Sequence, residues 1–92
     1  MALFTFLMEF RGGTYLAQVQ AKSPRAALRK WLHSLDAGPI AGMGPRTKRE
    51  FLRWLPEAGP TPISGLSRTW CASFVSRSGL ALIHFVQTEG RS

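Results

Sequence analysis

Alternating apolar residues at both ends of the chain constrain its fold more than any other feature of the sequence. Residues 3–21 contain two such runs, separated by a pair of glycines. The apolar positions are Phe4, Phe6, Met8, Phe10, Tyr15, Ala17, Val19 and Ala21. A period of two places them on one face, so the segment predicts a β-hairpin with one buried side. A two-residue Gly12-Gly13 turn pairs Phe6 with Val19 and keeps every facing pair apolar.

Residues 68–88 predict a second hairpin in the same way. A two-residue turn within 76–79 sets the apolar positions of one strand beside those of the other. The expected buried set is Trp70, Ala72, Phe74, Ala81, Ile83 and Phe85. Residues 89–92 are expected to fray as a polar tail.

Two helices are predicted between the hairpins. The first covers 23–36, because Ser23 suits the capping position and Pro24 suits the first helical position. The second is a short helix over 47–55, whose first residues have the Thr-x-x-Glu spacing of a capping box. By periodicity, inward positions on these helices and the second hairpin include Trp31, Trp54 and Trp70.

The predicted architecture is one α+β domain over residues 1–92. The order β-β-α-α-β-β makes a four-stranded antiparallel sheet from two hairpins, with one or two helices packed on one face. The segments 37–46 and 56–67 are expected as loops, the first rich in glycine and the second in proline. The order in which the hairpins join is not readable from the sequence.

The positive charge of the chain is concentrated between the two hairpins. The formal net charge is +7, and the segment 22–53 carries eight basic residues against two acidic ones. Such a cluster favours an anionic partner, either nucleic acid or an acidic protein. The residues expected to contact it are Arg25, Arg29, Lys30, Arg46, Lys48, Arg49 and Arg53. The alternative is a solvated basic surface that serves only solubility.

The outward face of the predicted sheet is apolar where polar residues would normally dominate. The expected outward positions include Leu7, Leu16, Val75, Leu80, Leu82 and Val86. A face of this kind predicts a protein interface, such as that of a homodimer. The alternative is that the loop 56–66 folds over the face within one chain.

Residues that carry chemistry are too few and too scattered to predict an enzyme. Cys71 and His84 are expected near each other on the outward face, but no carboxylate lies nearby in the sequence to orient the imidazole. The glycine-rich segment 38–45 lacks the Gly-Lys-Ser/Thr of a phosphate-binding P-loop. We therefore expect no catalytic residues, no metal and no cofactor. A single cysteine, and no apolar run of about 20 residues, favour a cytoplasmic protein without a membrane partner.

The opening hairpin is followed by Ser23-Pro24-Arg25-Ala26-Ala27-Leu28. This arrangement resembles the start of HicB-like antitoxin domains, where a short hairpin leads into a helix opened by Ser or Thr and an Ala-Leu pair. The resemblance covers the first third of the chain. It implies a small antitoxin-like protein whose partner is an RNA-cleaving toxin.

Overall fold

The structure is a computed structural model that describes residues 1–36 and 38–89. Residues 37 and 90–92 lie outside the described part, and with them most of the predicted tail. The elements are β1 Ala2–Phe10, β2 Gly13–Ala21, α1 Pro24–Ser34, α2 Pro45–Ala58, β3 Thr61–Pro62, β4 Thr69–Ser76 and β5 Gly79–Glu89. The predicted α+β class is confirmed. The antiparallel sheet has five strands instead of four, because the two-residue β3 adds to its edge.

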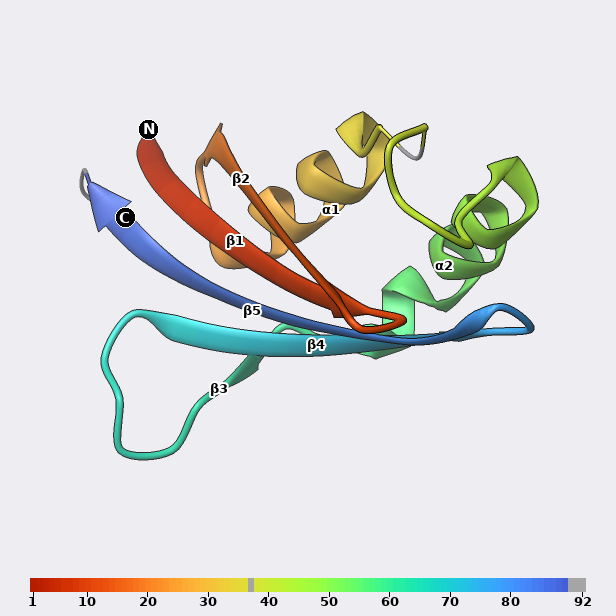
Figure 1. Ribbon diagram of the computed structural model, residues 1–92. Helices are drawn as coiled ribbons and strands as arrows, with labels where there is room; N and C mark the ends of the chain where they lie inside the picture. Colours follow the sequence, from red (N-terminus) through yellow and green to blue (C-terminus); the bar gives the residue numbers. More distant parts are fainter. Residues whose placement is uncertain (37, 90–92) are drawn as a thin grey trace.

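The two hairpins join through the first and last long strands. The strand order is β2-β1-β5-β4-β3, with β1 antiparallel to β5. Phe6 faces Phe85 and Met8 faces Ile83 across this junction, so the inward apolar rows of both hairpins become one surface. Both helices cover that surface, α1 on the β2 side and α2 on the β4 side (Figure 1). Within the described chain no helix lies on the opposite face, which we call the open face.

The predicted register of the first hairpin is wrong by two residues. The turn residues are Arg11 and Gly12, with φ angles of 49° and 80°, and Phe6 faces Ala17. A shift of two keeps every apolar side chain on its own face, so the apolar pattern alone does not separate the two registers. The observed turn is supported by Arg11, whose Nη1 donates to the Ser78 carbonyl oxygen at 2.9 Å.

The second hairpin has the predicted register. Its turn residues are Arg77 and Ser78, and Trp70, Ala72 and Phe74 face Phe85, Ile83 and Ala81. The Ser76 hydroxyl closes the turn, because it accepts from the Ser78 amide and donates to the Gly79 carbonyl, both at 3.1 Å.

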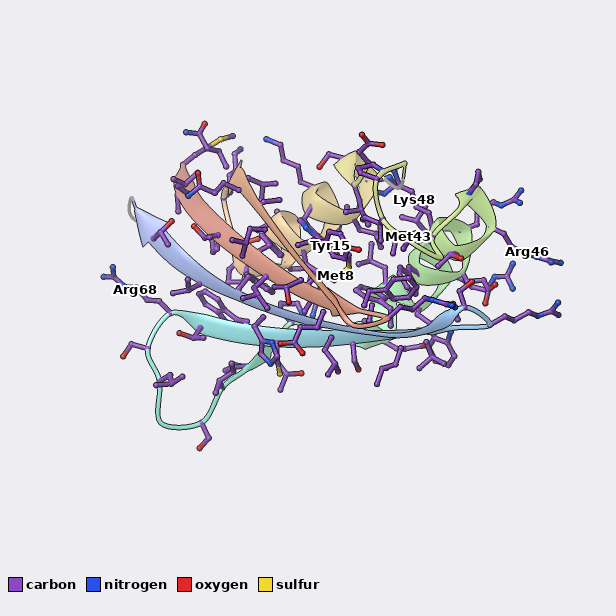
Figure 2. All side chains as sticks on the ribbon, in the orientation of Figure 1. Met8, Tyr15, Met43, Arg46, Lys48 and Arg68 are labelled. Carbon is purple, nitrogen blue, oxygen red and sulfur yellow. The ribbon has the colours of Figure 1, made fainter. Side chains whose placement is uncertain are left out.

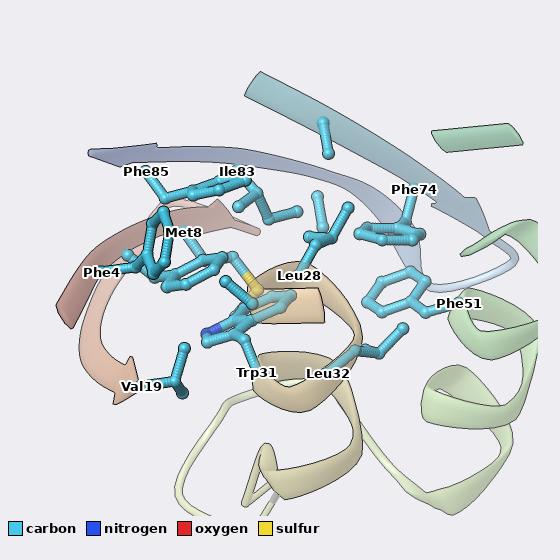
Figure 3. Packing of buried hydrophobic residues seen from close by; sticks show 14 of the residues in the cluster. Phe4, Met8, Val19, Leu28, Trp31, Leu32, Phe51, Phe74, Ile83 and Phe85 are labelled. Atoms are coloured by element: carbon cyan, nitrogen blue, oxygen red, sulfur yellow. The ribbon is translucent and has the colours of Figure 1, made fainter. Parts of the chain in front are cut away.

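Two groups of aromatic rings anchor the helices on the sheet (Figure 3). Trp31 of α1 stacks on Phe6 with ring centroids 5.4 Å apart, and Phe6 in turn stacks on Phe85 at 4.3 Å. Phe51 of α2 lies against Phe74 of β4, with centroids 5.4 Å apart. Each helix is therefore held by its own aromatic side chain, and aromatic pairs of this kind add to the stability gained from buried area.

The start of α1 agrees with the sequence prediction. The Ser23 hydroxyl accepts from the Ala26 amide at 3.1 Å, and Pro24 occupies the first turn. The helix ends at Ser34, two residues before the predicted end.

The second helix is longer than the predicted 47–55. It begins at Pro45 after an N-cap at Gly44 and continues to Ala58. Thr47 does not cap it. Its side chain is buried, and its Oγ1 lies 2.9 Å from the Ser78 Oγ in a hydrogen bond that ties α2 to the β4–β5 turn.

The three tryptophans do not share one environment. Trp31 is buried, and Trp70 is half-buried against Phe4 and Phe85. The inward position predicted for Trp54 is wrong, because the residue is 48% exposed. The reason is that α2 lies over β4, beyond which the sheet has only the two-residue β3.

The two connecting segments differ from simple loops. In the first, Ile40 and Met43 insert their side chains into the core, so this segment is anchored at two points. In the second, residues 61–62 extend the sheet beside β4 rather than crossing the open face. Leu82, which that loop would have covered, is 39% exposed.

Candidate functional site

Four arginines converge on one hollow beside α2. Arg46, Arg49 and Arg53 are exposed and, at spacings of three and four residues, lie on the same side of the helix. Arg77 reaches the same place from the β4–β5 turn. Together with Glu50 they line a hollow of about 300 Å³, which we call the arginine hollow. Arg46 projects outward from α2 at one end of the molecule (Figure 2).

The β4–β5 turn is held against α2 by hydrogen bonds. The Arg77 backbone amide donates to the Glu50 Oε2 at 3.1 Å, and Thr47 Oγ1 bonds Ser78 Oγ on the other side. The Arg11 guanidinium donates to the Ser78 carbonyl from the first hairpin. These contacts set the backbone position of Arg77, although its side chain is exposed.

Positive charge dominates the arginine hollow. It contains four guanidinium groups and one carboxylate, and that carboxylate already accepts a backbone hydrogen bond from Arg77. The first turn of α2 holds no acidic residue, so the positive end of the helix dipole adds to the same field. Guanidinium groups present planar pairs of N–H donors that match carboxylate and phosphate oxygens. The hollow is therefore suited to an anion with several oxygen atoms.

The set of anion-binding residues predicted from the sequence includes Arg46, Arg49 and Arg53 but not Arg77. The turn residues 76–79 carry no charge pattern, because Arg77 stands alone among serines and glycine. Its place beside α2 depends on the tertiary contact with Glu50, which no local pattern encodes.

The other predicted basic residues are not in the arginine hollow. Arg25 and Arg29 of α1 line a second cleft of about 200 Å³ against the C-terminal end of α2, where Leu55 and Pro56 lie. The exposed arginines of the two helices therefore form two separate sites, the arginine hollow at α2 and the cleft at Arg25 and Arg29.

Two lysines of the predicted set serve as links between elements. The Lys48 Nζ donates to the carbonyl oxygens of His33 and Leu35, both at 2.9 Å, where α1 ends. Figure 2 shows Lys48 on the side of α2 away from Arg46. The Lys30 Nζ donates to the Gln20 carbonyl of β2 at 2.9 Å. Both ammonium groups thus have backbone partners within the protein.

Trp54 is an exposed aromatic residue of α2 that does not itself line the arginine hollow. It follows Glu50 by four residues, so the two side chains are neighbours on the helix surface. The residue is 48% exposed, so packing in the core does not account for a tryptophan at this position.

The open face is apolar along a diagonal. Leu16 faces Leu7 across β2 and β1, Leu82 of β5 is the diagonal neighbour of Leu7, and Leu80 faces Val75 across β5 and β4. We call Leu7, Leu16, Val75, Leu80 and Leu82 the apolar band. Leu16 is 71% exposed and Val75 is 55% exposed. Val86, also predicted for this interface, is half-buried between Thr5 and Thr69 and lies outside the band.

Cys71 faces His84 across β4 and β5 on the same open face. Their position agrees with the prediction that strand alternation alone brings them together. Among the described residues, no group of three or more His, Cys, Asp or Glu side chains is placed to hold a metal ion. No helix in the described segments is long and apolar enough to cross a membrane.

Comparison of the chain with protein-family models, with curated proteins and with solved structures found no match. The resemblance of the first third to HicB-like antitoxin domains therefore stays a prediction.

Proposed function

We propose that the protein is a small nucleic-acid-binding domain whose arginine hollow holds the phosphates of a single strand. The observation that carries this proposal is the convergence of Arg46, Arg49, Arg53 and Arg77 on one hollow. Arginines that served only solubility would have no reason to gather from two separate elements, since like charges repel. An anionic ligand with several oxygens would offset that repulsion.

A nucleic acid fits this site better than an acidic protein does. Phosphates recur along a nucleic-acid backbone, so one strand could contact the arginine hollow and then the second cleft at Arg25 and Arg29. The exposed ring of Trp54 offers a surface on which a base could stack. Combined arginine and aromatic contacts are typical of proteins that bind single strands.

The test is fluorescence anisotropy with a labelled single-stranded oligonucleotide, made as DNA and as RNA, at two salt concentrations. We expect the double variant Arg49→Glu/Arg53→Glu to fold normally, because both side chains are exposed, and to bind at least about tenfold more weakly. Its salt dependence should also become shallower, by about 0.7 in the logarithmic slope for each phosphate that the variant no longer neutralises.

The matched control is Lys22→Glu/Arg68→Glu, which changes the net charge by the same amount at exposed positions outside both basic sites. Arg68 lies at the opposite end of the molecule from Arg46 (Figure 2). Equal reductions in affinity for the two double variants would contradict the arginine hollow, and so would a parent protein that does not bind at low salt. Trp54→Ala should weaken binding to the single strand more than binding to the duplex, and an equal effect on both would remove the stacking role.

A further inference from the structure

The open face is the one large surface of the sheet that carries no positive charge. None of the twelve lysines and arginines of the chain lies in the four long strands β1, β2, β4 and β5. The basic sites described above lie on the helices and on the β4–β5 turn. Glu9 is an exposed acidic residue on this face. The protein therefore separates a nearly uncharged side, where the apolar band crosses polar residues such as Gln18, Ser73 and His84, from a strongly basic one.

We propose that the open face is the interface of a homodimer in which two sheets pack face to face through the apolar band. A second copy is the partner that this charge distribution fits. Two chains of net charge +7 repel each other, and contact through the open face keeps their helix layers, and hence their arginines, on the outside of the pair. An acidic partner, by contrast, would be drawn to the helix layer.

The apolar band is also compatible with self-association across a two-fold axis. In an isologous interface the same patch meets itself, which excludes patches rich in one sign of charge. The band holds five aliphatic side chains spread over four strands, so two copies can interdigitate along the same diagonal. Aligned sheets in sandwich folds pack in this way, about 10 Å apart and rotated by about 30°.

The available area is enough for a dimer of modest affinity. With strands about 4.8 Å apart and outward residues about 6.8 Å apart along each strand, the whole outward side of the four long strands, polar residues included, covers roughly 500 Å² per copy. Two copies then bury about 1,000 Å², which is the lower limit for a specific interface. We therefore expect a dimer that forms in the micromolar range and exchanges rapidly.

The competing way to dimerise is through the free edge of β2. Strand alternation leaves the backbone groups of Thr14, Leu16 and Gln18 pointing away from β1. Lys30 of α1 donates to the Gln20 carbonyl at one end of this edge, but β2 itself holds no lysine or proline, so the stretch from Thr14 to Gln18 can accept another strand. An edge dimer would involve Leu16 but not Val75, which lies on β4 at the other side of the sheet.

Sedimentation velocity from micromolar to millimolar protein tests the proposal. We expect the parent chain to dimerise, and Leu16→Lys and Val75→Lys each to weaken the dimer about tenfold or more, because each substitution enters a two-fold interface twice. The matched control is Leu66→Lys, which introduces the same charge at a leucine that is 61% exposed on the segment between β3 and β4. It should leave the dimer unchanged.

A parent protein that stays monomeric to millimolar concentration would overturn the proposal. A dimer weakened by Leu16→Lys but not by Val75→Lys would show pairing through the β2 edge instead. A saturating oligonucleotide should leave face-to-face association intact, since its proposed site lies on the helix side. The dimer can therefore fail while nucleic-acid binding holds, and the reverse is also true.

Discussion

At the scale of single residues, Arg11 shows how a tertiary contact selects a local conformation. Its φ of 49° is unusual for a residue with a side chain, yet its guanidinium joins the two hairpin turns through Ser78. Its side chain also fills the space that a Cβ on Gly42 would need. The inward and outward faces could be read from the sequence because alternation determines them. The turn position could not, because the contacts of Arg11 come from distant segments.

Gly42→Ala tests this arrangement. Gly42 has a φ of 82° and would place its new Cβ against Arg11, whereas Gly65 has a φ of 84° and open space around it. We expect Gly65→Ala to lower the free energy of unfolding by about 1–2 kcal/mol through backbone strain alone. Gly42→Ala should cost more, and the excess should disappear in an Arg11→Ala background. Equal costs in urea unfolding would show that Arg11 does not occupy that space in solution.

At the scale of elements, the sequence predicts two helices but not how they meet. The capping-box spacing places the second start at Thr47, yet that hydroxyl bonds Ser78 and the helix begins at Pro45. Helical spacing predicts which side of α2 is basic, but it does not predict which basic residues bond within the protein and which face solvent. Lys48 bonds the carbonyl groups at the end of α1, and Arg49 beside it lines the arginine hollow.

The pair Lys48→Met and Arg49→Met separates these two roles with the same change in charge. Lys48→Met should lower the free energy of unfolding by about 1–2 kcal/mol, because two backbone acceptors lose a charged donor. Arg49→Met should change it by less than about 0.5 kcal/mol, since the side chain is exposed. Oligonucleotide binding should show the opposite order. If Lys48→Met weakens binding as much as Arg49→Met, Lys48 would belong to the binding site after all.

At the scale of the whole molecule, the segregation of charge has a consequence that joins the two proposals. A face-to-face dimer would carry one basic helix layer on each outer side, so its two arginine hollows would face away from each other. Two such sites cannot easily bind neighbouring phosphates of one short strand. They would instead bind different strands, or distant parts of one long strand, as bivalent ligands do.

The parent protein should therefore cross-link long single-stranded polynucleotides. Light scattering should rise as protein is added to a long homopolymer, and should fall again when excess protein occupies every segment separately. At a protein concentration where only the parent chain dimerises, Leu16→Lys should remove the rise while a short oligonucleotide still binds, because the substitution lies on the open face and adds positive charge. Leu66→Lys should behave as the parent does. Cross-linking that persists in Leu16→Lys would mean that a single chain bridges strands through the arginine hollow and the cleft at Arg25 and Arg29.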